Sequence, residues 1–522
     1  MKKIYFIIIA FTAFILNSCE KSLDVPQQGV TSTGNFYKTN ADAEEAIAAV
    51  YSSWKTAIFN DFFLRNMLSD DVICGGGGRG DNTQLEQLNE YTFGSTNTFI
   101  SGAFGNYYNI IYLSNLVINN FSTDTDVKKR VIAEAKVARS WSYFNLVTLW
   151  GPVPFVLKEL SPSEYQQKNG DVEAIWAQIE KDLQDAVESN TLPQKSSPTD
   201  KSTGAHLTHQ AALSFLGKAQ VFRGKYAEAA ATLKQVINSG KYELFPVYEN
   251  LLVPETDFNP ESVFELNSIN DANNTNQGTG VIANMFGWRN DHMNLWANTK
   301  GLAPYLGWGF FNPQKSLYDA FVATEGIDGY RLTGSMKTYP QIMSFNCFIN
   351  PGSYLYGHQG YFTWKYRLRS SDWVGSNVLG THYNFKLMRY AEVLLLAAEA
   401  SIKSGDEASA RDYVNQVRIR AQVPIFTSAI TMDNIKNEKR LELWMEQVRY
   451  QDILRWGDAP SLLAQQGKDI PSFYGLKQDG TYDIRITYSN SAYGFKTGKH
   501  ELLPMPQSEM NVNDNLIQNP GW

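Results

Sequence analysis

The sequence predicts a mainly helical protein whose helices pair as antiparallel hairpins around one large irregular, loop-rich insert with short β-strands. Apolar residues recur at three- and four-residue steps over most of the chain, which is the period of a helix with one buried face. That period lapses over residues 243–385, where asparagine, glycine and tryptophan are frequent and short β-like runs such as Ser262 to Leu266 occur.

An internal repeat connects two distant parts of the chain. The segments that begin at Gly217 and Ala398 align with an offset of 181 residues, and small residues and a turn glycine recur at the same places. This pattern is typical of tetratricopeptide-like hairpins, which bury little alone and stack on neighbours. We therefore predict a tetratricopeptide-like scaffold in two parts, residues 36–242 and 386–522, interrupted by the insert (residues 243–385).

The start of the chain resembles an export signal. Two lysines precede an apolar run over residues 4–16, which is shorter than the roughly 20 residues that a membrane-spanning helix needs. The run ends close to Cys19, where bacterial lipoproteins carry an acylated cysteine, although Asn17 departs from their usual pattern. We predict a lipoprotein signal peptide over 1–18 and a lipid-anchored tether over 19–35. The alternative is a soluble secreted protein with an incidental cysteine.

Helices are expected over residues 127–150 and 172–188, the first ended by glycine and proline. Thr39 and Asp42 have the spacing of a capping box. A buried helical stripe follows them, formed by Ala43, Ile47, Val50, Trp54 and Ile58.

Three other segments carry weaker patterns. Residues 69–103 are polar and glycine-rich, and a loop of that length inside a compact body is usually functional or disordered. Residues 432–456 are rich in alternating charge and read as one helix. From about residue 465 no clear period is present, which predicts a loop-like end.

Composition excludes several classes of function. The net charge is −7 with no long basic run, which argues against nucleic-acid binding. No HExxH, GxSxG or phosphate-loop motif occurs, so an enzyme is not expected. His206 and His209 lack a third ligand nearby in sequence, and no metal is expected there. For Cys74 and Cys347, a disulfide and two buried thiols both remain open.

Five segments, in order along the chain, resemble the SusD/RagB family of surface lipoproteins. The resemblance covers nearly the whole mature chain. Two departures are visible, Glu446-Gln447 for the family's Glu-Gly and His206 to His209 for its Arg-x-Thr. The segments are AEAKVARSWSYFNLVTLWGPVP from Ala133, LGWGFFNPQKSLYDAF from Leu306, FKLMRYAEVLLLAAEA from Phe385, IKNEKRLELWMEQVRYQDILRWGD from Ile435 and LLPMPQSEMNVNDNLIQNPGW from Leu502.

This resemblance implies a function at the outer membrane, in an outward-facing lipoprotein tethered only by its N-terminal lipid. The family binds a nutrient, most often an oligo- or polysaccharide, and delivers it to a partner SusC-like TonB-dependent transporter. Two alternatives are the same role for a non-sugar nutrient such as peptide and, more remotely, a surface glycoside hydrolase. Some members hold a structural calcium ion, but no matching acidic cluster is present, so no cofactor is expected.

A sugar ring offers an apolar face and a rim of hydroxyls, so its binding needs flat aromatic faces beside Asp, Asn or Arg side chains. In the family, ligand residues tend to come from the loop after the first helix and from the segment around the central Trp-Gly motif. The alternative for each tryptophan is core packing, and Arg79 and Asp81 could simply pair with each other in a solvated loop. The candidate glycan-binding residues are Trp308, Trp296, Trp288, Tyr305, Arg79, Asp81, Asp70, Asp71, Asn82 and Tyr361.

Overall fold

The computed structural model describes residues 36–268, 279–289, 291–294, 306–367 and 384–522. Its helices are α2 (Asn40–Met67), α3 (Thr83–Glu90), α4 (Thr98–Asn120), α5 (Asp126–Trp150), α6 (Val172–Glu188), α7 (His209–Phe222), α8 (Tyr226–Asn238), α9 (Thr279–Phe286), α10 (Lys315–Glu325), α11 (Tyr330–Ser335), α12 (Tyr339–Met343), α13 (Tyr390–Lys403), α14 (Glu407–Arg420), α15 (Met432–Glu442), α16 (Arg449–Trp456), α17 (Ala459–Leu462) and α18 (Gln507–Met510). Its strands are β1 (Val72–Cys74), β2 (Ser262–Leu266), β3 (Trp288–Arg289), β4 (Met293–Asn294), β5 (Leu306–Gly307), β6 (Phe311–Pro313), β7 (Met336–Thr338), β8 (Phe348–Ile349), β9 (Leu355–Tyr356), β10 (Tyr361–Thr363), β11 (Phe385–Arg389), β12 (Asp469–Leu476) and β13 (Tyr482–Ser489).

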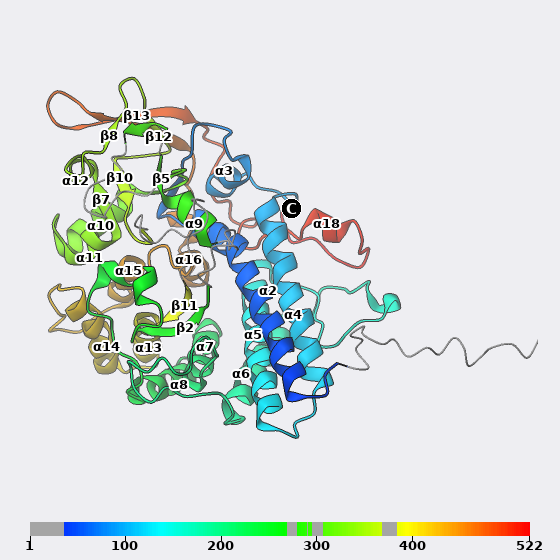
Figure 1. Ribbon diagram of the computed structural model, residues 1–522. Helices are drawn as coiled ribbons and strands as arrows, with labels where there is room; N and C mark the ends of the chain where they lie inside the picture. Colours follow the sequence, from blue (N-terminus) through cyan, green and yellow to red (C-terminus); the bar gives the residue numbers. More distant parts are fainter. Residues whose placement is uncertain (1–35, 269–278, 290, 295–305, 368–383) are drawn as a thin grey trace, which may run out of the picture.

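The scaffold, which we define as α2, α4 to α8, α13 and α14, packs largely in chain order. α5 lies against α6, α6 against α7, α7 against α8, α8 against α13 and α13 against α14. The hairpins on either side of the insert therefore form one continuous array (Figure 1). Gly224 and Gly405 occupy the two hairpin turns with φ of +71° and +92°, a conformation that glycine adopts without strain. The predicted mainly helical, tetratricopeptide-like fold is confirmed.

α2 joins the scaffold to the insert through one apolar core. It begins at the predicted capping box, in which the Thr39 hydroxyl accepts from the Asp42 N–H at 3.1 Å and the Asp42 carboxylate accepts from the Thr39 N–H at 2.7 Å. The predicted stripe is buried along its length. Near its end, the Phe62 ring lies 5.1 Å from Phe286 and 6.3 Å from Phe311 of the insert, so both parts share the core.

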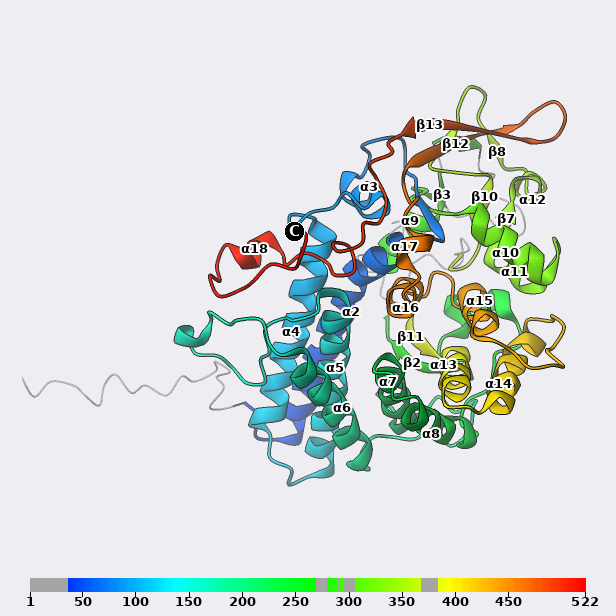
Figure 2. The same ribbon diagram turned by 180° about the vertical axis from the view of Figure 1, so that it is seen from behind.

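The insert begins and ends beside the scaffold. β2 and β11 pair antiparallel, with Leu266 opposite Phe385. The other small sheets gather at the opposite end of the molecule from α8 and α14, as both views show (Figures 1 and 2). There β1 pairs with β6, β3 with β5, β4 with β8, β7 with β10, and β9 with β12.

The glycine-rich segment is shorter than predicted. Residues 69–103 contain β1, α3 and the start of α4, so one long loop is wrong; the parts outside helices and strands are the short stretches 69–71, 75–82 and 91–97. α3 begins because the Asn82 side chain accepts from the Leu85 N–H at 3.2 Å, and the Asn97 side chain caps α4 in the same way, accepting from the Phe99 N–H at 3.1 Å. Asparagine is among the preferred N-cap residues.

The single helix predicted over residues 432–456 is broken into α15 and α16. Met445 and Gln447 in the break both have φ of +65°. A glycine, as in the family pattern, would adopt that conformation more easily than Gln447 does. Here the Arg65 guanidinium stabilises Gln447 in this conformation, because it donates at 2.9 Å to both the Gln447 carbonyl and the Gln447 side-chain oxygen.

The loop-like end predicted from residue 465 is wrong over residues 469–489, where β12 and β13 form a hairpin, and holds after it, where α18 is the only helix or strand. The turn of this hairpin contains Asp479-Gly480, with Gly480 at φ of +81°, and Asp-Gly is a strong hairpin signal. Beyond the hairpin, the chain returns to the scaffold, where the Trp522 ring stacks 5.1 Å from Phe93.

A buried network of charges fixes the insert to the scaffold. Glu442 at the end of α15 contacts Arg331 of α11 at 3.2 Å, Arg389 at the end of β11 at 3.2 Å, and Arg420 of α14. All four side chains are nearly inaccessible to solvent. Burial alone would raise the pKa of Glu442, but Arg420, Arg389 and Arg331 outweigh burial and hold that pKa well below its usual range. We call these four residues the junction network.

No disulfide joins Cys74 to Cys347, and both thiols are buried. Burial raises the pKa of the Cys74 thiol well above its usual value. Within the described residues, no helix has both the length and the apolar character needed to span a membrane.

Candidate glycan-binding site

The glycine-rich loop and the Trp308 segment, both predicted site regions, lie side by side. The Gly75 and Gly76 N–H groups donate to the carbonyls of Phe310 and Gly309 at 3.0 and 2.9 Å, which extends the β1–β6 pairing. A Cβ on Gly75 would clash with the Gly309 carbonyl, so this close approach requires glycine. Three strand pairs, β1–β6, β3–β5 and β4–β8, therefore hold the surface in place.

Arg289 stands at the centre of this surface, and sequence reasoning missed it. Its guanidinium donates to the Trp308 carbonyl at 3.2 Å and lies between two carboxylates, 3.4 Å from Asp81 and 2.6 Å from Asp291. Asp81 also accepts from the Gly77 N–H at 2.6 Å. The Asp81 and Asp291 side chains are 38% and 52% exposed, so each can reach a ligand while remaining positioned by Arg289.

Aromatic rings continue the surface beyond Asp291. His292 contacts the Tyr354 carbonyl at 2.7 Å. The Tyr354 ring stacks on Tyr474 of β12 with centroids 5.1 Å apart, and the Arg485 guanidinium of β13 lies 4.1 Å from the Tyr474 ring centre. Tyr354 and Tyr474 are half-buried, which is the exposure that a stacking platform needs. Trp308, whose carbonyl accepts from Arg289, is half-buried too, and part of its side chain packs against the main core.

Arg79 lies at the margin of this surface and does not pair with Asp81. Its guanidinium donates to Glu90 at 3.0 Å, lies 3.5 Å from Glu86 and covers the Tyr488 ring at 4.2 Å. The hydrogen bond to Glu90 is the main reason that the pKa of Arg79 is raised above its usual value. We define the candidate site as Asp81, Arg289, Asp291, Trp308, Tyr354, Tyr474 and Arg485, with Arg79 at its edge.

Asp70 and Asp71 do not join this site. Both are buried at the start of β1, where Arg449 holds Asp70 through two hydrogen bonds of 2.8 Å and Arg440 holds Asp71 at 2.7 Å. Burial raises the pKa of Asp71, whereas Arg449 outweighs burial at Asp70 and lowers its pKa. Neither carboxylate has an exposed edge for a ligand.

Three further predicted residues have structural contacts. Trp288 is 6% exposed and donates its indole N–H to the Thr363 carbonyl at 3.1 Å. Tyr361 is equally buried and stacks on Tyr318 at 4.3 Å. Asn82 is the N-cap of α3. Trp296 and Tyr305 lie outside the described residues, and their assignment stays a prediction.

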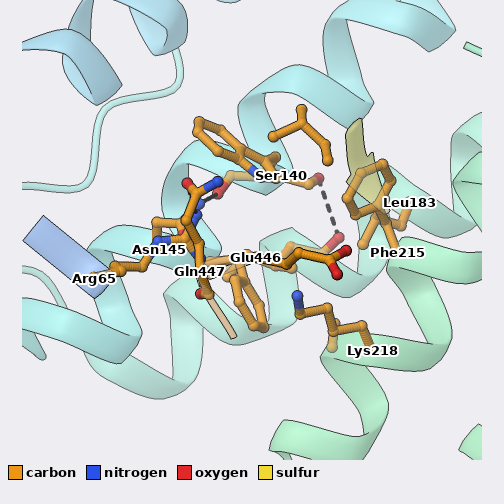
Figure 3. A pocket seen from close by; sticks show the side chains of 13 residues that line it. Arg65, Ser140, Asn145, Leu183, Phe215, Lys218, Glu446 and Gln447 are labelled. Carbon is orange, nitrogen blue, oxygen red and sulfur yellow. Dashed lines mark hydrogen bonds between the residues drawn. The ribbon is translucent and has the colours of Figure 1, made fainter. Parts of the chain in front are cut away.

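Apart from the candidate site, a cavity lies inside the scaffold, between α2, α5, α6 and α7 (Figure 3). Arg65, Lys218 and Glu446 point into it beside Leu183 and Phe215. The room in it for the centre of a water molecule is about 20 Å³, which suits about one water. Lys218 is already paired with Glu392 at 2.8 Å, and burial lowers its pKa. This hollow is a small polar cavity, too small for a sugar ring.

The described residues hold no group of three or more His, Cys, Asp or Glu side chains arranged for a metal ion. The candidate site itself contains carboxylates, guanidinium groups and aromatic rings. Such a set offers ring faces and paired hydrogen bonds to a polyhydroxylated ligand.

Two family models match the chain. The model described as "SusD family" matches residues 352–522, and the model described as "Starch-binding associating with outer membrane" matches residues 23–221. Among curated proteins, SusD-like protein P2 of Formosa agariphila is 25% identical over 548 residues, covering 100% of this chain and 99% of that protein. A SusD-like protein of Bacteroides ovatus is 24% identical over 86% of this chain and 82% of its own length.

Solved structures agree with these matches. A laminarin-binding SusD-like protein superposes with a TM-score of 0.77 and 27% identity, covering 93% of this chain and all of that one. Surface glycan-binding protein A of Bacteroides thetaiotaomicron, solved with laminarihexaose, has a TM-score of 0.72 at 21% identity over 92% of this chain and 100% of that one, which supports the fold. These relatives are named as SusD-like or glycan-binding proteins. Because the two family models together match more than half of the chain, and the fold is shared over 93% of the chain with a laminarin-binding SusD-like protein, the chain belongs to the SusD family.

Proposed function

We propose that this protein binds a nutrient glycan at the cell surface and passes it to a SusC-like TonB-dependent transporter, without catalysing a reaction on it. One observation supports a glycan more than other ligands: half-buried aromatic residues lie next to a carboxylate–guanidinium–carboxylate set, to which they are joined through His292 and the Trp308 carbonyl. The rings suit the apolar face of a sugar, and the charged groups suit paired hydroxyls.

Laminarin is the first ligand to test, because a relative with 27% identity is named as laminarin-binding. Isothermal titration of the folded protein against laminarin, starch and a panel of plant and algal glycans should give binding to at least one. Arg289→Ala removes the group that positions both carboxylates, and we expect at least a tenfold weaker affinity, equivalent to about 1.4 kcal/mol. Binding of peptides and of no glycan would favour the non-sugar alternative.

The absence of catalysis has its own test. Glycans that bind are incubated with the pure protein, and new reducing ends are measured over hours. No increase over a buffer control is expected. Sustained release of reducing ends would support a surface hydrolase instead.

The membrane anchor and the partner complete the proposal. We expect Cys19 to carry lipid, so that Cys19→Ala moves the protein from the membrane fraction to the soluble fraction and abolishes labelling by palmitate. We also expect a tagged protein to co-purify with a TonB-dependent transporter from outer membranes. Unchanged membrane association of Cys19→Ala would contradict the anchor.

A further inference from the structure

The charges of the candidate site are already paired with one another. Arg289 lies between Asp81 and Asp291, and its side chain is only 19% exposed. Each carboxylate is more exposed than the guanidinium that it neutralises. A ligand approaching from solvent therefore meets the negative groups of this set before the positive one.

The other two arginines are also paired with carboxylates, although each is more exposed than its partners: Arg485 is 59% exposed against 21% for Asp483, and Arg79 is 35% exposed against 5% for Glu86 and 3% for Glu90. Arg485 donates to Asp483 through bonds of 3.0 and 2.6 Å while it lies over Tyr474. Arg79 is held by two carboxylates, Glu86 and Glu90, as described above. Bidentate pairing of this kind occupies two donors of each guanidinium group and offsets the positive charge that a ligand sulfate or carboxylate would need.

The charge balance of the surface is negative. Counted together with the carboxylates that pair with them, the three arginines face five acidic groups, an excess of two negative charges; these are Asp81, Asp291, Asp483, Glu86 and Glu90. Placing like charges together across an interface disfavours binding, and such repulsion is a common source of specificity.

We propose that the candidate site selects uncharged glycans and rejects anionic ones, because carboxylates of the chain already neutralise its arginines. This inference rests on the proposed function and narrows its ligand class. Uronic-acid polymers and sulfated polysaccharides are excluded as ligands, although both are polyhydroxylated and offer the same ring faces as neutral glucans.

The test compares laminarihexaose with oligomers of a polyuronate and of a sulfated galactan by isothermal titration. The wild type should bind the neutral oligomer equally at about 0.1 M and about 1 M salt, where the screening length falls from about 10 Å to about 3 Å. It should bind neither anionic oligomer. Should laminarihexaose fail, the neutral glycan that binds in the wider panel replaces it.

A double variant, Asp81→Asn with Asp291→Asn, exposes the Arg289 charge. We expect it to gain binding of the sulfated or the uronate oligomer by at least tenfold, and to lose that gain in about 1 M salt. The matched control, Glu228→Gln with Asp412→Asn, changes the net charge equally on exposed residues of α8 and α14 and should gain nothing. Asp291→Asn alone, at a half-exposed position, provides a second variant if the double variant does not fold.

The outcomes separate the two proposals. Wild-type protein that binds an anionic oligomer as tightly as a neutral one overturns this inference and leaves glycan binding intact. The same holds if folded variants keep neutral binding and gain no anion binding. Failure of the folded wild type to bind any glycan overturns the proposed function and this inference together.

Discussion

The scaffold and the insert are stabilised in different ways. The scaffold helices pack on their neighbours in the array through buried apolar stripes and small residues. Most of these contacts join helices that follow one another in the chain, and the contacts of α13 with α8 and α7 span the insert. The insert contains strands of two to five residues that pair with strands distant in sequence. The junction network connects the insert to the scaffold through buried ion pairs. Regular packing thus supplies a rigid frame, while the surface that meets a ligand depends on a few long-range contacts.

The largest effect is expected at the junction network. Glu442→Gln leaves three buried guanidinium groups without their shared carboxylate, and breaking a buried pair from one side costs about 3–5 kcal/mol. Urea unfolding at neutral pH measures the loss. The pKa of Glu442 is lowered by folding, so its contribution is full above its ordinary value of about 4.5 and is lost as pH falls below it. The difference between variant and wild type should therefore shrink in acid.

Asp319→Asn is the control for that prediction. Its ion pair with Lys315 is about half exposed on both sides, and such pairs contribute about 0–1 kcal/mol. Equal losses in the two variants would show that the junction network has no special weight.

Within the scaffold, Leu233→Ala removes the side chain that fills the space above Gly217 at the crossing of α7 and α8. A buried leucine replaced by alanine costs about 2–5 kcal/mol. The folded variant should bind glycan with wild-type affinity, because the hairpin lies far from the candidate site (Figure 1). A large loss of affinity at full folding would mean that the two regions are coupled.

Trp308→Ala acts on the ligand surface instead. Loss of a stacking ring should weaken glycan affinity by about ten- to a hundredfold, which is about 1.4–2.7 kcal/mol. The ring is half-buried, so the melting temperature should change by only a few degrees. A variant that melts much earlier but binds normally would place Trp308 in the core.

The smallest effect concerns the glycine-rich loop. A Cβ at Gly77 would lie 2.5 Å from the Arg289 guanidinium, so Gly77→Ala should push that flexible side chain aside and weaken binding by a few fold. Gly105→Ala, where an added Cβ meets nothing within 4 Å, is the control. Identical affinities for both variants would remove Arg289 from the site.

The difference between local packing in the scaffold and long-range pairing in the insert also explains which features could be predicted from the sequence. The expected helices over residues 127–150 and 172–188 match α5 and α6 to within one residue, because a long apolar period and a terminal cap are local signals. The β12–β13 hairpin was missed although its Asp479-Gly480 turn is a local signal too. Arg289 was missed because two-residue strands carry no readable period, and only their pairing brings it to Asp81.

Of the proposed ligand residues, Trp308 and Asp81 lie in the candidate site, and Arg79 lies at its edge. Asp70 and Asp71 were placed with them because they are adjacent in sequence to the loop. Their partners Arg440 and Arg449 lie more than 360 residues away in the chain, a distance at which sequence pattern gives no warning of a buried ion pair.

The pairing of β2 with β11 has a consequence for how the protein can change. Leu266 and Phe385 lie opposite each other. The two ends of the segment over residues 267–384 are therefore close together, beside the scaffold. Closing a longer segment there adds only about 0.6 kcal/mol for each doubling of its length. Chimaeras that exchange this segment between relatives therefore change Arg289, Asp291, Trp308 and Tyr354 together, while the helical frame and the site residues Asp81, Tyr474 and Arg485 stay the same.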